Sequence, residues 1–307
     1  SKTLNKSKGR SVWSPRSQID KNLYEKIAQK HISDIGLDVL EGEVVSLKVQ
    51  NSAVCGVVLK DKSLIPCSAA VLTCGTFLNG LIHIGDKQIN AGRYGEKRAK
   101  GITENLNSFG LLSGRLKTGT PPRVQKNSIN WGVGDADYGD KNPYPLSYRT
   151  KNFKPKDEPC FSFKTNNKTH NMILDNLSSS AMYSGKDMAT GPRYCPSIED
   201  KVCKFRSNPS HLLQLEPEWT RSKQIYVNGF STSLSESVQL ECLKTVRGLE
   251  NVKFIRPGYA IEYDFFYPSQ LKNSLESKAI SGLFLAGQIN GTSGYEEASS
   301  QGIIAGI

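Results

Sequence analysis

The last twenty-six residues, Gly282-Leu-Phe-Leu-Ala-Gly-Gln-Ile-Asn-Gly-Thr-Ser-Gly-Tyr-Glu-Glu-Ala-Ser-Ser-Gln-Gly-Ile-Ile-Ala-Gly-Ile307, contain the pattern that decides the fold. Residues 283–286 are a short apolar run, typical of a strand buried on both faces of a parallel sheet. Residues 287–294 form a polar loop whose three glycines let a backbone approach a ligand closely. A helix is predicted from Tyr295, so its N-terminus would offer N–H groups to a phosphate or a reduced flavin. The alternative is an ordinary strand–loop–helix corner.

Length and charge set the limits of the interpretation. The chain has 307 residues and a mass of 33.8 kDa, which allows one to three domains. Its formal net charge is +11 and its pI is about 9.2, which favours an acidic partner, with nucleic acid ahead of a membrane surface. Excess positive charge is also common in organellar proteins.

Cysteine and histidine usage argues against a disulfide framework and against a zinc site. The seven cysteines are scattered and form no CxxC, and the four histidines lie far apart in the sequence. A reducing compartment is the simpler interpretation. No apolar run approaches the roughly eighteen residues that a membrane helix needs.

Periodicity predicts the order of the other elements. Ile19, Leu23 and Ile27 recur every four residues, which predicts an amphipathic helix over residues 17–30. Alternating apolar residues predict a β-meander, and Ala69-Ala-Val-Leu-Thr-Cys74 is predicted to be a fully buried strand. The meander strands are residues 43–49, 54–59 and 63–67. Further helices are predicted over residues 100–109, 172–177, 196–205 and 238–246, and extended segments over residues 254–266.

This order indicates one nucleotide-binding domain interrupted by another. From Arg123 to about Pro159 the composition shifts to Asn, Asp, Gly, Pro, Lys and Tyr, as at the entry to a second, loop-rich unit. No G-x-G-x-x-G occurs, so the first strand and phosphate loop of such a fold would lie upstream of Ser1. Because the chain starts without Met and stops inside a helical pattern at Ile307, we expect an internal fragment of a longer protein.

Two basic segments are candidates for phosphate or RNA contacts. Residues 1–16 carry five Lys and Arg and no acid, as in a solvated arm or a segment that contacts phosphates. Residues 148–163 interleave Tyr and Phe with Lys and Arg, which suits either an RNA-facing surface or a mobile surface loop.

The richest stretch for chemistry is Gly191-Pro-Arg-Tyr-Cys-Pro-Ser-Ile-Glu-Asp-Lys201. Pro196 suits the first position of a helix, which would place Cys195 at the N-cap. A thiol there, two residues from Arg193, would have more thiolate character. The alternative is a small buried cysteine.

Two further stretches are candidate anion sites. Arg115-Leu-Lys-Thr-Gly-Thr-Pro-Pro-Arg123 surrounds a rigid Pro-Pro turn, and its three cations suit phosphates or the negative edge of a flavin, or else a solvated hinge strand. In Ala91-Gly-Arg-Tyr-Gly-Glu96, two glycines flank Arg93, which again suits an anion loop.

Several of these stretches together resemble the GidA/MnmG family of tRNA-modifying flavoproteins over nearly the whole chain. The matching segments are residues 4–9, 75–78, 82–85, 114–123, 191–201, 215–218, 256–264 and 287–297. The resemblance implies an α/β fold of the two-dinucleotide-binding, glutathione-reductase-like type: a Rossmann FAD domain with a β-meander and an inserted α/β nicotinamide-nucleotide domain. The expected divisions are residues 1–123 and 257–307 for the FAD domain and 124–256 for the NAD(H) domain, without the N-terminal phosphate loop and a C-terminal helical domain.

The function that the resemblance implies is modification of the wobble uridine of tRNA at C5 with a carboxymethylaminomethyl-type group. Expected cofactors are FAD and NADH, with methylene-tetrahydrofolate as one-carbon donor and glycine, or taurine in some organelles, as amine. Expected partners are tRNA, an MnmE-type GTPase and a second copy of the chain, without a membrane. Lys, Asn and Ser richness, basic charge and departures at Trp219, Val227 and Ser299–Ser300 favour a fungal-type mitochondrial member in the matrix.

Site residues are carried over position by position. Val44 would meet the adenine end of FAD and Gln288 its flavin end, while residues 191–205 match the nicotinamide-nucleotide segment. Cys195 matches one of two cysteines that the family needs, and a thiolate is suited to adding at uracil C6 so that C5 becomes nucleophilic. Asp200 or Glu199 would shuttle the C5 proton. The expected catalytic residues are Cys195, Arg193 and Asp200. The expected cofactor-binding residues are Val44, Gly75, Gly92, Arg93, Lys117, Gly191, Pro192, Arg193, Tyr194, Cys195, Gly287, Gln288, Gly294, Tyr295 and Glu296.

Two rival functions stay open at this point. One is a folate-dependent tRNA uridine C5 methyltransferase, a related flavoprotein, which residues 191–201 and 256–264 match less well. The other is a non-catalytic scaffold of the same fold that binds RNA or a GTPase. Cys195, Arg193 and Gln288 argue against the scaffold.

Overall fold

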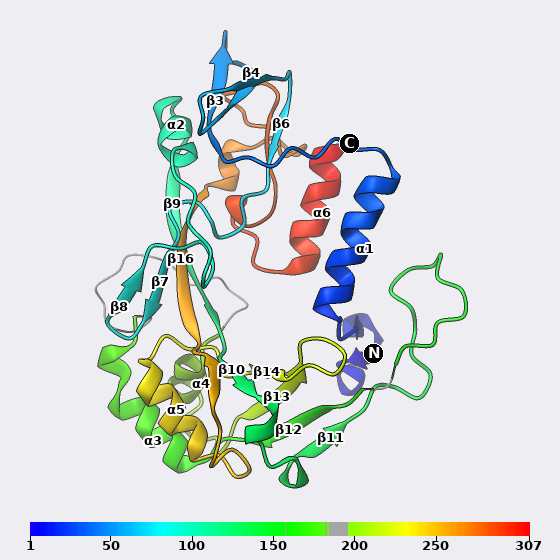
Figure 1. Ribbon diagram of the computed structural model, residues 1–307, viewed down its shortest axis with the longest axis vertical. Coiled ribbons are helices and arrows are strands. Elements are labelled where there is room, and N and C mark those ends of the chain that lie inside the picture. The colour runs from blue at the N-terminus through cyan, green and yellow to red at the C-terminus, as the bar shows by residue number, and fades with distance from the viewer. Residues whose placement is uncertain (157, 182, 184–195) are drawn as a thin grey trace.

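The computed structural model describes residues 1–156, 158–181, 183 and 196–307 (Figure 1). One part of the molecule, at the top of Figure 1, contains β3, β4, β6 and α6, and the opposite part contains the largest sheet with α3, α4 and α5. The long strands β9 (Ser113–Thr120) and β16 (Tyr259–Phe266) run between the two parts. The fold is mixed α/β with several sheets.

A parallel strand pair organises the upper part. β6 (Ala70–Leu72) pairs with β17 (Leu283–Leu285) in parallel, and α6 (Tyr295–Gly306) follows β17 after a loop, as predicted. Their apolar side chains join the core formed by the meander and α2. The expectation that the first strand is fully buried is wrong, because Val71 is 43% exposed. Within the described residues β17 is the only strand paired with β6, so the other edge of β6 carries no paired strand.

The predicted β-meander is confirmed beside this pair. Antiparallel strands β3 (Val44–Gln50), β4 (Ala53–Leu59) and β5 (Leu64–Pro66) follow one another, and Asn51 and Ser52 make the first turn with positive φ. The predicted helix is also present as α2 (Ile102–Ser108), and Gly110 follows it at φ 85°, a backbone conformation that glycine adopts without strain.

Six described strands form the largest sheet, and all of its pairings are antiparallel. In spatial order they are β11 (Asp135–Asp137), β12 (Cys160–Lys164), β13 (Leu212–Pro217), β14 (Gln224–Asn228), β10 (Arg123–Gln125) and β15 (Phe254–Arg256). Three helices share its core: α3 (Asn167–Asp175), α4 (Ile198–Lys204) and α5 (Glu236–Lys244). This core draws on residues 124–254, and the division into three domain segments stays a prediction.

A smaller antiparallel sheet connects the two parts. Its order is β8 (Lys87–Ile89), β7 (Leu81–Ile84), β16 and β9. The β16–β9 pairing runs over eight residue pairs, from Tyr259↔Thr120 to Phe266↔Ser113. This sheet positions the polar network described below.

The N-terminal segment folds back on the six-stranded sheet. Strands β1 (Lys2–Leu4) and β2 (Ser14–Arg16) form an antiparallel pair that encloses two 3-10 turns. Helix α1 (Lys21–Asp34) then begins four residues later than expected, because the Asp20 side chain accepts a hydrogen bond from Leu23 N and so caps it. Its predicted apolar face is present but exposed, with Leu23 55% and Ile27 57% accessible. No helix in the described part of the chain is long and apolar enough to cross a membrane.

Candidate functional site

The ends of the two parallel strands form the first part of the candidate site. Gly75 follows β6 at φ 57°, and Gly287 follows β17 at φ 88°. Carboxyl ends of parallel strands meet at one edge of a sheet, where α/β proteins commonly bind ligands. A Cβ atom on Gly75 would lie 3.7 Å from Gln288 Oε1, so the structure brings Gly75 and Gln288 together.

The loop after β17 is fixed from within. Gly287 N donates to Gln301 Oε1 at 2.8 Å, and Asn290 Nδ2 donates to Leu285 O at 2.9 Å. The Thr292 hydroxyl is buried and has no hydrogen-bond partner among the described residues. Buried hydroxyls are normally paired, so this one suits a polar atom of a bound ligand.

The N-terminus of α6 offers fewer unpaired backbone N–H groups to an anion than its sequence indicates. The Glu297 carboxylate accepts hydrogen bonds from Ser293 N and Gly294 N, each at 3.1 Å. These two N–H groups are therefore not free for a phosphate. Tyr295 is 91% exposed and Glu296 is exposed at the same end.

Gly92 and Arg93 lie on a second loop beside Gly75. Thr76 Oγ1 donates to Gly92 O at 2.7 Å. A Cβ atom on Gly92 would lie 2.3 Å from the Phe77 ring, so close packing requires glycine there. Arg93 forms an ion pair with Glu96 at 3.3 Å, in which both side chains are 49% exposed. Its charge is therefore already partly offset, and an anion would have to compete for it.

Val44 lies apart from this loop pair, at the start of β3. It pairs with Leu59 in the meander and packs against the upper core. Its predicted contact with the adenine end of FAD stays a prediction.

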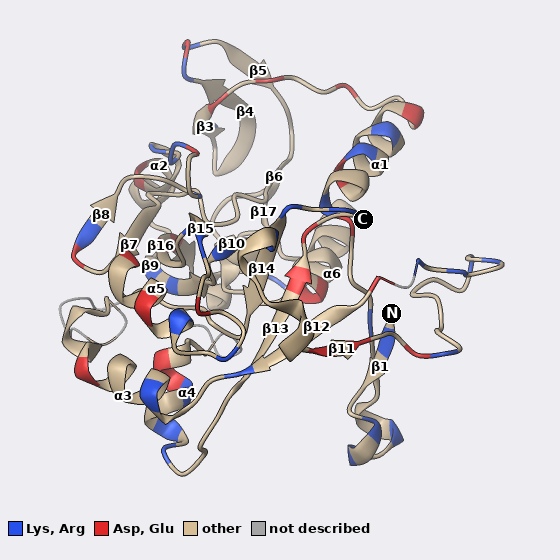
Figure 2. Ribbon diagram, turned by 60° about the horizontal axis from the view of Figure 1, so that its bottom comes forward, with Lys and Arg blue, Asp and Glu red and all other residues tan. Residues whose placement is uncertain are grey.

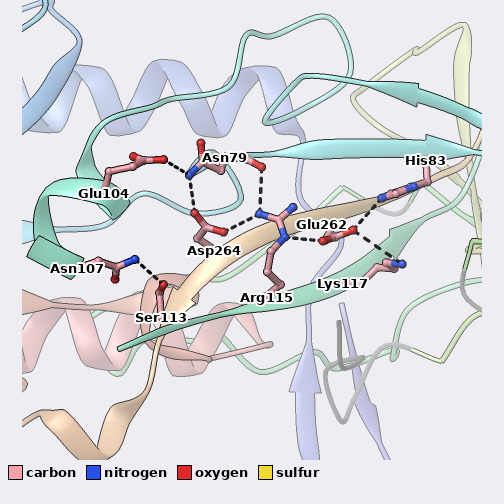
Figure 3. A network of polar contacts seen from close by, with 9 residues as sticks. All are labelled: Asn79, His83, Glu104, Asn107, Ser113, Arg115, Lys117, Glu262 and Asp264. Atoms are coloured by element: carbon pink, nitrogen blue, oxygen red, sulfur yellow. Dashed lines mark hydrogen bonds and ion pairs between the residues drawn. The ribbon is translucent and has the colours of Figure 1, made fainter. Parts of the chain in front are cut away.

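A network of charged side chains lies on the β7–β16–β9 sheet (Figure 3). Arg115 donates through Nε to Glu262 Oε1 at 2.5 Å and through Nη1 to Asp264 Oδ1 at 2.6 Å. The β16–β9 register sets this geometry, since it pairs Asp264 with Arg115. A hydrogen bond with His83 at 3.0 Å, together with Arg115, lowers the pKa of Glu262 to about 2 against the effect of burial.

Lys117 is the buried cation of this network. Only 3% of it is exposed, its Nζ lies 4.0 Å from Glu262 Oε2, and it donates to Ala181 O at 3.2 Å. It therefore links the sheet to the chain just before residue 182. Its role toward a cofactor stays a prediction.

The other two cations of that stretch already have acceptors. Arg115 is held by two carboxylates, and Arg123 donates to Thr120 Oγ1 and Pro121 O, each at 2.7 Å, while its guanidinium stacks on Tyr226. The expected phosphate contacts of Arg115 and Arg123 are therefore not supported. Sequence reasoning missed the network itself, although Glu262 and Asp264 alternate within a stretch predicted to be extended.

The helix after the cysteine-containing stretch begins later than predicted. Ser197 is the N-cap of α4: its Oγ accepts from Asp200 N at 3.1 Å, and Asp200 Oδ2 accepts from Ser197 N at 2.9 Å. The prediction of Cys195 as N-cap is wrong, because a serine hydroxyl two residues further on makes this reciprocal pair. The preceding site candidates lie outside the described residues: Gly191, Pro192, Arg193, Tyr194 and Cys195.

The two acids of α4 have different surroundings. Burial opposes ionisation of Asp200, but hydrogen bonds from Ser197 and from the Tyr183 hydroxyl at 2.9 Å hold its pKa below the usual value. Its predicted role as a proton shuttle stays a prediction. Glu199 is fully buried, and burial raises its pKa although Oε1 accepts three hydrogen bonds. Oε2 has no partner in the described part of the chain.

A metal ion needs a set of ligand side chains that lie close together. No cluster of three or more His, Cys, Asp or Glu among the described residues has the geometry to hold a metal ion. The cysteines that the structure describes are all unpaired.

Comparison with known proteins places the chain among relatives of similar sequence. A protein family described as glucose inhibited division protein A matches residues 1–307. The tRNA uridine 5-carboxymethylaminomethyl modification enzyme MnmG of Chlorobium phaeobacteroides is 49% identical over 307 residues, which cover 99% of this chain and 49% of the relative. The enzyme of the same name from Thermodesulfovibrio yellowstonii is 49% identical over 305 residues, with the same coverage.

Solved structures agree with this match. Aquifex aeolicus GidA superposes in its form I crystal with a TM-score of 0.93 at 45% identity, covering 99% of this chain and 52% of that one. The form II crystal gives a TM-score of 0.91 at 43% identity. The chain thus spans about half the length of the relatives that it matches.

Proposed function

The chain belongs to the glucose inhibited division protein A family, and on this premise we propose that it is part of an FAD-dependent enzyme that modifies the wobble uridine of tRNA at C5. The observation that carries the proposal is the match along the whole chain to relatives named for carboxymethylaminomethyl modification of tRNA uridine. The group added is of the carboxymethylaminomethyl type.

The edge of the β6–β17 pair suits a flavin. Gly75 and Gly287 have no side chains and leave their backbones open to close approach. Gln288 contributes an amide next to Gly75, and the Thr292 hydroxyl is an unused buried hydrogen-bonding group in the described structure. When bound, FAD supplies the redox chemistry of the reaction. The protein's own part is to hold the ring at this edge.

Cys195 is the proposed nucleophile toward the base. Addition of its thiolate to uracil C6 places electron density on C5, which then attacks an electrophilic one-carbon unit. Loss of the C5 proton and release of the thiolate restore the aromatic base, and Asp200 is the proposed acceptor of that proton. Methylene-tetrahydrofolate would supply the carbon at the oxidation level of formaldehyde and leave as tetrahydrofolate. Glycine would bond to that carbon through its amine, and NADH, bound at residues 191–205, would keep the flavin reduced.

The assembly and location are part of the same proposal. The protein would act as a homodimer with an MnmE-type GTPase in the mitochondrial matrix. Basic charge and sequence divergence support the mitochondrial location. Growth of cells on a non-fermentable carbon source after gene disruption, with imaging of the tagged protein, tests it.

The test of the chemistry is mass spectrometry of wobble nucleosides from cells that carry the intact protein with Cys195→Ser. We expect the C5 group to disappear while protein level and bound flavin persist. Cys203→Ser is the matched control, since Cys203 lies on α4 and is not part of the proposed chemistry. Normal modification with Cys195→Ser would contradict the mechanism, and an intact protein that purifies without flavin would favour a non-catalytic scaffold.

A further inference from the structure

The positive charge of this chain is concentrated in two segments. Residues 1–16 and residues 141–156 each carry five Lys or Arg and no Asp or Glu. Together they account for ten of the eleven net positive charges of the chain. We call them the arm and the basic loop. The rest of the chain is therefore close to neutral, and the proposed chemistry leaves these segments without a role.

The fold places the arm beside β11 and the start of the basic loop, although more than a hundred residues of chain separate them (Figure 2). Strand β11 lies at the edge of the six-stranded sheet, and the basic loop begins shortly after it. Lys2 forms an ion pair with Asp137 on that strand. Asp140, just before the basic loop, accepts from Thr3 N at 2.9 Å and pairs with Lys6 at 2.8 Å. The arm is thus docked on the sheet edge rather than free in solvent.

Most of the charge is left unused by this docking. Besides Lys2 and Lys6, Arg16 is paired, with Glu216 at 2.6 Å. The other seven cations of the two segments are exposed and have no ion pair among the described residues. They are Lys8, Arg10, Lys141, Arg149, Lys151, Lys154 and Lys156. An excess of seven unpaired cations in two segments that meet beside β11 attracts a polyanion.

A groove lies between the arm and the start of the basic loop. Its volume is about 590 Å³. The arm contributes Trp13 and Lys6 to its lining, and the other side contributes Lys141 and Tyr144. Trp13 is 44% exposed and Tyr144 is 74% exposed, so both rings are open to a ligand. We call this cavity the arm–loop groove.

Trp13 is held in place for such a contact. Its Nε1 donates to Lys6 O at 3.3 Å, and the Arg10 guanidinium lies 5.6 Å from the centre of its ring. An indole that is fixed at its edge and has a guanidinium beside it is a stacking platform of the kind that single-stranded nucleic acids use. An acidic peptide would use the cations but would leave the exposed rings without matching partners.

We propose that the arm–loop groove binds a single-stranded stretch of the substrate RNA, with a base stacked on Trp13 and phosphates held by Lys8, Arg10 and Lys141. This inference rests on the proposed function, because that function makes an RNA the substrate. It adds a docking surface built from the arm and the sheet edge, separate from the loops at the β6–β17 edge. Base stacking supplies sequence-tolerant affinity, and the phosphate contacts make it salt-dependent.

The experiment measures binding of the intact protein to unmodified tRNA and to a twelve-nucleotide oligouridine by filter binding between 50 and 300 mM salt. Trp13→Ala should weaken both affinities about tenfold, since stacking on one aromatic ring contributes about 1–3 kcal/mol per base. Trp13→Phe should restore most of the affinity. The triple variant Lys8→Gln, Arg10→Gln, Lys141→Gln should reduce the slope of log affinity against log salt by about 2, at about 0.7 per phosphate contact.

A charge-matched control is available elsewhere on the surface. Lys48, Lys87 and Lys253 are exposed, have no ion pair in the described structure and lie outside both segments. Replacing these three by Gln removes the same charge and should leave the salt slope nearly unchanged. Thermal unfolding of each variant shows whether it folds as the parent protein does.

Each outcome distinguishes this inference from the proposed function. If the parent protein binds tRNA and the groove variants bind it as well as the control does, the groove is not the docking surface and the proposed function stands. If the parent protein binds neither RNA, both proposals fail. If the groove variants keep RNA binding but lose sedimentation with phosphatidylserine vesicles, the surface serves a membrane and the inference is wrong.

Discussion

Two regions of this molecule pair positive with negative side chains, one inside the protein and one on its surface. On the β7–β16–β9 sheet, the Arg115 side chain is 31% exposed and contacts Glu262 and Asp264, which are 11% and 9% exposed. At the arm, Lys6 forms an ion pair with Asp140. The Lys6 side chain is 52% exposed and the Asp140 side chain is 24% exposed. Water solvates a lone charge in the second region but reaches it poorly in the first. Similar pairings should therefore respond very differently to the removal of one partner.

The largest effect is expected from Arg115→Met. This change removes the guanidinium that Glu262 and Asp264 share and leaves His83 and Lys117 as the remaining partners of Glu262; breaking a buried ion pair in this way costs about 3–5 kcal/mol. Urea denaturation of the purified protein should show a loss of that size in the free energy of unfolding. A loss below about 1 kcal/mol would mean that water reaches the network freely. The ion pairs of this sheet would then behave like those of the arm.

Acid should weaken the same region by a similar amount. The pKa of Glu262 is about 2 in the folded chain against an ordinary value of 4.5, so its ionised form stabilises the fold fully above pH 4.5. That contribution, about 3 kcal/mol at about 1.4 kcal/mol per pKa unit, is lost as the pH falls from about 4.5 to about 2. Urea titrations at several pH values should show this loss, and Glu262→Gln should remove most of it. An unchanged acid profile in Glu262→Gln would contradict the assignment.

Asn79 allows the network to be probed without removing a charge. Its Nδ2 donates to Glu104 at 2.9 Å and to Asp264 at 2.7 Å, and its backbone has φ 48°. Asn79→Ala should cost about 2–3 kcal/mol, since the part-buried hydrogen bond to the charged Asp264 contributes about 1.5–3 kcal/mol and the exposed one to Glu104 contributes less, while alanine tolerates this φ poorly. Asn79→Gly relieves the backbone strain alone. Equal losses in both variants would show that the hydrogen bonds dominate, whereas full recovery in Asn79→Gly would show that they contribute little.

The smallest effect is expected on the arm. Lys6→Met removes the Asp140 ion pair in an exposed setting, where water and salt screen the two charges and such pairs contribute little to stability. The difference from the parent protein should shrink further in 1 M salt, where the Debye length is about 3 Å. A loss as large as that of Arg115→Met, measured by the same urea titration, would place this ion pair with the buried ones.

Much of the fold follows from local sequence. The strand at β17, the meander, α2, α5 and α6 were all predicted within a few residues, because periodicity and glycine or cap positions act over short distances. Family membership could also be predicted, because several stretches of this chain match stretches of the GidA/MnmG family and follow one another in the same order along the sequence. Of the site, sequence predicted Gly75 and Gln288 as separate motifs, and the fold shows that they are neighbours.

Local pattern was less reliable where competing groups lie close together in the chain. Cys195 and Ser197 are both plausible caps for the helix that follows, and the structure assigns the cap to Ser197 through its reciprocal bonds with Asp200. Likewise, Arg115 and Arg123 suit phosphates by composition, yet carboxylates and carbonyls of the protein already accept their hydrogen bonds.

The sequence by itself determined where the strands, turns and glycine loops occur, and that the charge of the chain lies in the arm and the basic loop. Only the tertiary structure decided which charges are neutralised: the β16–β9 register joins Arg115 to Glu262 and Asp264, and the docking of the arm on β11 joins Lys2 to Asp137. The physical reason is range. Backbone preferences and helix capping act within one or two turns of chain. The electrostatic energy of a charge depends instead on the groups that the fold brings next to it from distant parts of the sequence, and on how much water reaches it.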